Sequence, residues 1–141
     1  MPTALRRPLL ILALCAAVPS AAQPAPSAAW ADELLQAVNQ ARAAAGLAPL
    51  RAAATLQAVA QGHSDTMARE RRLTHDGFDA RLDGTGRSLC VENVAGGTLD
   101  PQLLINAWSR APLHRRNLFE PRVREAGVAA AGRYVTLFAC D

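Results

Sequence analysis

Residues 108–118 read WSRAPLHRRNL, and residues 91–95, upstream of them, read VENVA. The first stretch combines a tryptophan, a proline-broken turn and the imidazole of His114. The second contains the carboxylate of Glu92, in an alanine-rich neighbourhood where ionisable side chains are scarce. We therefore expect these two segments to decide the fold and to carry any chemistry that the chain performs.

The length and composition are those of one globular domain. The chain has 141 residues, of which 50% are hydrophobic. A chain of this size can bury one sizeable core but not two. No internal repeat is visible in the sequence.

The N-terminus has the layout of a secretory signal peptide. Two arginines precede an apolar run at residues 9–18, and Ser20-Ala21-Ala22 is a small-x-small cleavage site. A membrane anchor would need about 20 uninterrupted apolar residues, which is more than this run supplies. The alternative is a lipoprotein signal ending at Cys15, but the large residue Leu14 stands where a small one is normal.

Three parts of the chain are thus predicted. Residues 1–22 form the signal peptide, residues 23–30 form a Pro/Ala-rich linker that we expect to be disordered, and residues 31–141 form the folded domain. No other stretch is apolar enough to span a bilayer. We expect a mature protein without a transmembrane segment that is secreted or periplasmic.

The charge does not favour a nucleic-acid partner. The formal net charge is +3, but loss of Arg6 and Arg7 with the signal peptide would leave 13 of the 15 basic residues against 12 acidic ones. Basic residues are not clustered along a groove-reading element. Arg115-Arg116 form a local patch. A solvated pair is the default interpretation of this patch, and an anionic headgroup or wall polymer is the alternative.

Two cysteines, Cys90 and Cys140, remain after cleavage. An even pair in an oxidising compartment predicts a disulfide. The alternative, a catalytic thiol, needs an exposed setting that lowers the thiol pKa. Cys140 stands near the end of an apolar strand and does not offer such a setting.

The hydrophobic pattern predicts helices followed by a hairpin. Helical spacing of apolar residues predicts helices at about residues 32–45 and 53–71, and Asp100-Pro101 opens a third helix that ends at Pro112. Turn residues at 74–87 predict a loop. The two β-rich runs at 126–130 and 134–140 predict a hairpin. This order predicts an α+β fold with helices packed on a small antiparallel sheet.

Motifs along the chain resemble, in order, those of the CAP superfamily, which comprises cysteine-rich secretory proteins, antigen 5 and pathogenesis-related protein 1. The resemblance is to the short form that bacteria secrete, and it covers residues 34–140. The matching segments are Asn39-x-x-Arg42, Gly46-Leu47-x-Pro49-Leu50, Ala60-x-x-His63-Ser64-x-x-Met67-Ala68, Leu73-Thr74-His75, Glu92-Asn93-Val94-Ala95, residues 108–118 and the terminal hairpin.

The resemblance implies an α-β-α sandwich whose cavity gathers two histidines and two acidic residues. Motif by motif, His75 and His114 take the places of the histidines and Glu92 that of one acid. The second acid would stand three residues after Trp108, where this chain has Ala111. The set is incomplete, and no mechanism that needs two carboxylates is expected.

Two interpretations of this set remain open. Two neutral imidazoles and one carboxylate can hold zinc or another divalent metal while a position stays free for water. Alternatively, His75 and His114 donate hydrogen bonds to Glu92 or to backbone carbonyls and tie loops to the sheet.

Other polar residues have structural and functional interpretations. His63 lies on the apolar face of the second predicted helix, so it is either a satisfied core residue or part of the cavity. Asn93 is suited to hold a backbone bend next to Glu92. Trp108 is expected to pack in the core and to fix the end of the third helix. Ser64 and Ser109 lack the Gly-x-Ser-x-Gly context of a serine hydrolase.

Three functions follow from these observations. The preferred one is a non-enzymatic binding module that recognises a lipid, an envelope component or a partner protein through a groove around His75, Glu92 and His114. The resemblance supports it, because sterol and lipid binding is attributed to several members of the superfamily. The alternatives are a divalent-metal-dependent hydrolase that uses the same three residues and a purely structural envelope protein.

Overall fold

A computed structural model describes residues 26–141 of the chain. Within this range the helices are α1 (Ala28–Ala44), α2 (Ala54–Glu70), α3 (Phe78–Thr85), α4 (Pro101–Arg110) and α5 (Pro112–Leu118), and the strands are β1 (Arg51–Ala52), β2 (Cys90–Gly96), β3 (Glu125–Ala131) and β4 (Tyr134–Cys140). The predicted signal peptide at 1–22, the Cys15 alternative and residues 23–25 of the linker lie outside the described residues. None of the helices described is long and apolar enough to cross a membrane.

The sheet has the strand order β1-β3-β4-β2. β4 pairs antiparallel with β2 and with β3, whereas the two-residue β1 pairs parallel with β3. The expected antiparallel sheet is therefore mixed at one edge. The other edge is β2, and this strand carries Glu92.

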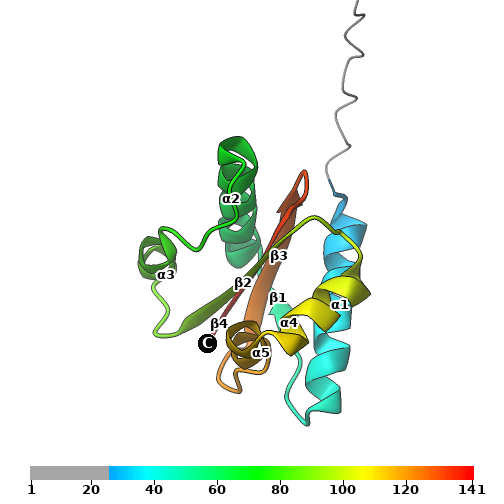
Figure 1. Ribbon diagram of the computed structural model, residues 1–141. Coiled ribbons are helices and arrows are strands. Elements are labelled where there is room, and N and C mark those ends of the chain that lie inside the picture. Colours follow the sequence, from blue (N-terminus) through cyan, green and yellow to red (C-terminus); the bar gives the residue numbers. More distant parts are fainter. Residues whose placement is uncertain (1–25) are drawn as a thin grey trace, which may run out of the picture.

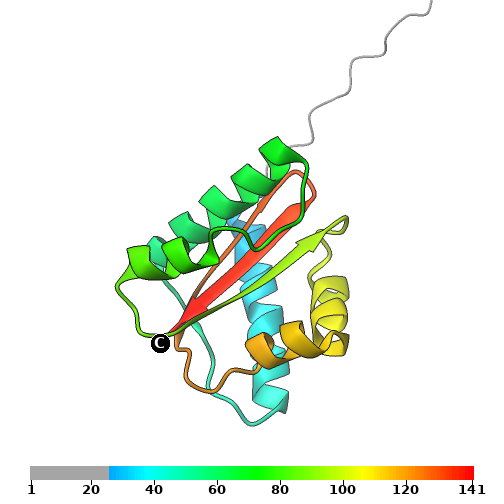
Figure 2. The same cartoon turned by 60° about the vertical axis from the view of Figure 1, so that its left-hand side comes forward.

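Helices cover both faces of the sheet. α2 and α3 lie on one face, and α1, α4 and α5 lie on the other (Figures 1 and 2). The expected α-β-α sandwich is thereby confirmed. The two faces have separate apolar cores, because side chains alternate along each strand: Phe138 packs toward α2 and α3, and Leu137 packs toward α1 and α4.

The contact between α2 and β3 depends on Gly127. A Cβ atom at this position would lie 2.1 Å from the backbone of Leu56 in α2. Only a residue without a side chain lets the helix approach the strand this closely.

Most predicted elements are present. α2, α4 and the β3–β4 hairpin agree with the pattern, and Asp100 caps α4 by accepting a hydrogen bond from the Leu103 amide at 2.9 Å. Helix α1 begins at Ala28, three residues before the predicted domain boundary. Ser27 explains the earlier start, because its side chain caps the helix by accepting from the Trp30 amide.

One expectation was wrong, and one helix was not expected. The predicted loop at 74–87 contains helix α3, which is bounded by Gly77 and Gly86 in left-handed conformations. Phe78 and Leu82, one turn apart, pack this helix on the core, and this burial outweighs the turn signal of Asp83-Gly84. The third predicted helix, α4, ends before Pro112 as expected. Pro112 then begins α5, which the pattern did not predict, because a missing N–H is harmless at the first position of a helix.

Candidate functional site

Glu92 is the centre of the candidate site. It lies on the edge strand β2, two residues after Cys90, so both side chains face α2 and α3. Its carboxylate is 1% exposed. A buried carboxylate requires a compensating charge or hydrogen bonds, since an uncompensated one is very costly.

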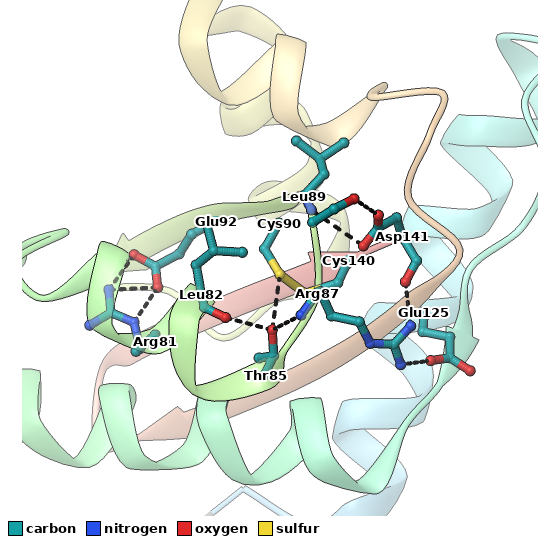
Figure 3. Close-up of a disulfide and its surroundings, with 11 residues drawn as sticks. Arg81, Leu82, Thr85, Arg87, Leu89, Cys90, Glu92, Glu125, Cys140 and Asp141 are labelled. Atoms are coloured by element: carbon teal, nitrogen blue, oxygen red, sulfur yellow. Dashed lines mark hydrogen bonds and ion pairs between the residues drawn. A yellow bond between two sulfur atoms is a disulfide. The ribbon is translucent and has the colours of Figure 1, made fainter.

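Arg81 of α3 supplies the compensating charge. Its Nε donates to Glu92 Oε2 at 2.9 Å, and its terminal nitrogen NH2 donates to Oε1 at 2.8 Å (Figure 3). This fork-to-fork geometry is the strongest form of the arginine–carboxylate pair. Because both oxygens accept from Arg81, α3 is attached to the edge of the sheet through Glu92.

Two histidines lie beside the same carboxylate. His75 donates from Nδ1 to Glu92 Oε1 at 2.8 Å, and its side chain is half exposed. His63 is buried, donates from Nε2 to the Thr74 carbonyl at 2.8 Å, and stands 3.7 Å from Glu92 Oε1. Burial lowers the pKa of His63 despite the nearby carboxylate, so the ring is neutral and makes no ion pair.

His114 faces this group from α5. Its ring centroid lies 6.2 Å from that of His75. Burial, followed by the nearby His75, lowers the pKa of His114. The His114 carbonyl accepts a hydrogen bond from Asn93 Nδ2 at 2.9 Å. Asn93 therefore connects β2 to α5 rather than only holding a bend.

Asn117 makes the second connection between β2 and α5. Its Nδ2 donates to the Glu92 carbonyl at 2.9 Å and to Asn93 Oδ1 at 3.2 Å. Together, Asn93 and Asn117 fix α5 against the edge strand, so that His114 is presented toward His75.

A groove runs along this edge, between α3 and α5. Its volume is about 390 Å³, and it is lined by His75, Phe78, Cys90, Val91, Glu92, Leu113, His114, Arg116 and Asn117. His75, Glu92 and His114 thus line one groove. His63 contacts the same carboxylate but is not among the lining residues.

The residues do not fit a metal centre as they lie. Within residues 26–141, no group of three or more His, Cys, Asp or Glu side chains is arranged to hold a metal ion. Both oxygens of Glu92 are bonded to Arg81, and a second cation there would meet the repulsion of the guanidinium. Ala111, between α4 and α5, offers no second carboxylate.

A disulfide joins Cys90 to Cys140, as predicted. The two residues are paired across β2 and β4, two positions from Glu92. Next to the disulfide, Arg87 donates to the Asp141 carbonyl and to Glu125, and Thr85 donates to the Leu82 carbonyl (Figure 3). The disulfide therefore fixes the first residue of the edge strand β2 covalently, next to the site.

Sequence reasoning missed Arg81 and Asn117. Arg81 lay in the segment assigned to a loop, and only the helical spacing of Phe78 and Leu82 could have placed it on a helix. Asn117 lies inside residues 108–118, but nothing in the sequence distinguishes it from a surface amide.

The family model described as "Cysteine-rich secretory protein family" (CAP) matches residues 35–140. This chain belongs to that family. A curated relative, "Uncharacterized protein YkwD" of Bacillus subtilis (strain 168), is 27% identical over 112 residues, which are 74% of this chain and 44% of the relative. This chain therefore spans less than half of that relative's length.

Solved structures of bacterial proteins share the CAP fold. A cysteine-rich secretory protein of Staphylococcus aureus has a TM-score of 0.72 at 23% identity, over 79% of this chain and 38% of that one. An extracellular protein containing an SCP domain, from Bacillus anthracis, has a TM-score of 0.74 at 23% identity, over 79% and 40%. An outer surface protein of Borrelia burgdorferi has a TM-score of 0.76 at 18% identity, over 85% and 98%.

Proposed function

We propose that this CAP domain is a secreted or periplasmic, non-enzymatic binding module that holds an amphipathic ligand of the lipid class in the groove between α3 and α5. The groove itself carries this proposal. Its volume of about 390 Å³ falls within the usual range for ligand pockets, about 300–1,000 Å³. Phe78, Val91 and Leu113 give it apolar walls, and His114 and Arg116 place polar groups at its edge.

Secretion is supported by two observations. The first 22 residues have the layout of a signal peptide. The neighbours from Bacillus anthracis and Borrelia burgdorferi are described as an extracellular protein and an outer surface protein. The alternative ligands for the same groove are an envelope component and a partner protein.

The chemistry of Glu92 argues against the hydrolase alternative. A general base must have a free oxygen directed at the water or substrate, whereas both oxygens of Glu92 accept from Arg81 and one also accepts from His75. Ala111 supplies no substitute acid. We infer that Glu92 shapes the groove and does not react.

A fluorescent fatty acid is a direct probe of the proposal. Wild-type protein should bind it, and Val91→Phe, which fills the groove from its wall, should weaken binding at least tenfold. The matched control is Ala45→Phe, which adds the same side chain in a different groove, beside Phe119. Absence of binding by the wild type, or an equal loss in both variants, would contradict the proposal.

A further inference from the structure

The helices α4 and α5 carry positive charge without acidic residues. Residues 101–119 contain three arginines, Arg110, Arg115 and Arg116, and no Asp or Glu. Within the part of the chain that the structure describes, none of the three forms an ion pair. All three are exposed.

The acidic residues that flank the two helices in the sequence are engaged elsewhere. Asp100, before α4, accepts from the Leu103 amide, and Glu120, after α5, accepts from Arg122 at 2.7 Å. Neither carboxylate neutralises the arginines of the two helices. The positive charge of this pair of helices is therefore available to an outside partner.

The same two helices expose large apolar side chains. Among the described residues, three large hydrophobic side chains are exposed, and two of them are Leu103 on α4, 54% exposed, and Leu113 on α5, 66% exposed. Leu113 and Arg116 are one turn apart on α5, on the same side of the helix. Leu103 and Arg110 are two turns apart on α4 and also share a face.

From this combination we infer that the α4–α5 surface, defined by Arg110, Leu113, Arg115 and Arg116, docks on an anionic phospholipid bilayer. Guanidinium groups bind phosphate with paired hydrogen bonds, and polybasic surfaces are attracted to anionic lipid. Leu113 shares a side of α5 with Arg116, and a leucine beside a guanidinium matches the boundary between headgroups and acyl chains. A hydrophilic polyanion would engage the arginines but would not bury the exposed side chain of Leu113.

The strength of docking can be bounded. A basic residue near an anionic membrane surface contributes about fivefold in affinity, so three arginines together contribute about 100-fold. Insertion of a single leucine adds about tenfold. The resulting attachment is weak and reversible, and salt should release it because screening acts on exposed charges.

The test is co-sedimentation of the mature chain, residues 23–141, with vesicles of phosphatidylglycerol and phosphatidylcholine, compared with phosphatidylcholine alone. The triple variant Arg110→Gln, Arg115→Gln, Arg116→Gln should reduce binding to the anionic vesicles about 100-fold. Leu113→Gln should reduce it about tenfold.

A matched control removes three other arginines. Arg69→Gln, Arg71→Gln and Arg133→Gln change the net charge equally, but these residues lie at the end of α2 and in the β3–β4 turn, at the opposite end of the molecule from α5 (Figure 1). This control should retain binding within a few fold. Circular dichroism confirms that each variant is folded, as expected for substitutions at exposed positions.

Three results would overturn the inference. One is unchanged binding in the α4–α5 triple variant, and another is an equal loss in the control, which would show an effect of net charge only. The third is full competition by soluble polyphosphate together with no effect of Leu113→Gln, which would assign the surface to a polyanion. Leu113 and Arg116 also line the groove, whereas Arg110 and Arg115 do not. The double variant Arg110→Gln, Arg115→Gln should therefore weaken vesicle binding and leave fatty-acid binding intact, and Val91→Phe should do the reverse, so this inference and the groove proposal can fail separately.

Discussion

Replacement of Arg81 by glutamine should destabilise the fold strongly. The substitution leaves the Glu92 carboxylate, 1% exposed, without its cationic partner. Removal of one member of a buried ion pair costs about 3–5 kcal/mol. Because the Arg81 side chain is 16% exposed and His75 still donates to Glu92 Oε1, we expect a loss at or just below the lower end of this range, about 2–3 kcal/mol.

Urea unfolding at pH 7, followed by tryptophan fluorescence, measures this loss. In the Arg81→Gln background, Glu92→Gln should restore at least about 1 kcal/mol, because it removes the unpaired buried charge. The matched control is Arg72→Gln, since Arg72 pairs with Asp76 on the surface and its loss should matter far less. A cost below about 0.5 kcal/mol for Arg81→Gln, or no recovery in the double variant, would refute the structural role of the pair.

Three further predictions concern the fold. Gly127→Ala should destabilise by about 3 kcal/mol or more in urea unfolding, because the added methyl group would overlap the α2 backbone; an unchanged midpoint would show that α2 and β3 are not in this contact. Replacing Cys90 and Cys140 together by alanine should cost about 4 kcal/mol for a loop of 50 residues, and a free-thiol assay that finds two reactive thiols in the denatured, unreduced mature protein would disprove the bond. Stability should fall as pH is lowered from 7 to 5.5, because His63 and His114 have pKa values below those of the unfolded chain, near 6.5, and unfolding therefore takes up protons; His63→Gln and His114→Gln should each flatten this dependence.

Local signals in the sequence were enough to predict the elements whose boundaries are marked by capping or turn residues. The capping residue Asp100 with Pro101 placed the start of α4, and the two apolar runs around Gly132 placed the hairpin. α3 was missed because Asp83-Gly84 looks like a turn. Its stability comes from the packing of Phe78 and Leu82 on the sheet, which no local pattern reveals.

The candidate site was predicted through the family resemblance and not from local patterns. The family resemblance brought His75, Glu92 and His114 together, although they are far apart in the sequence. The pairing of Arg81 with Glu92 depends on α3, so it could not be foreseen once that segment was assigned to a loop. That these residues form a ligand-binding groove stays a prediction, and a structure with a bound ligand would test it.

A crystal structure of the protein grown with a fatty acid would test the account most directly. We predict density for the acyl chain between α3 and α5, against Phe78, Val91 and Leu113, with Arg81 still bonded to both oxygens of Glu92. Acyl chains bound only elsewhere, or a metal ion in place of Arg81 on Glu92, would contradict it.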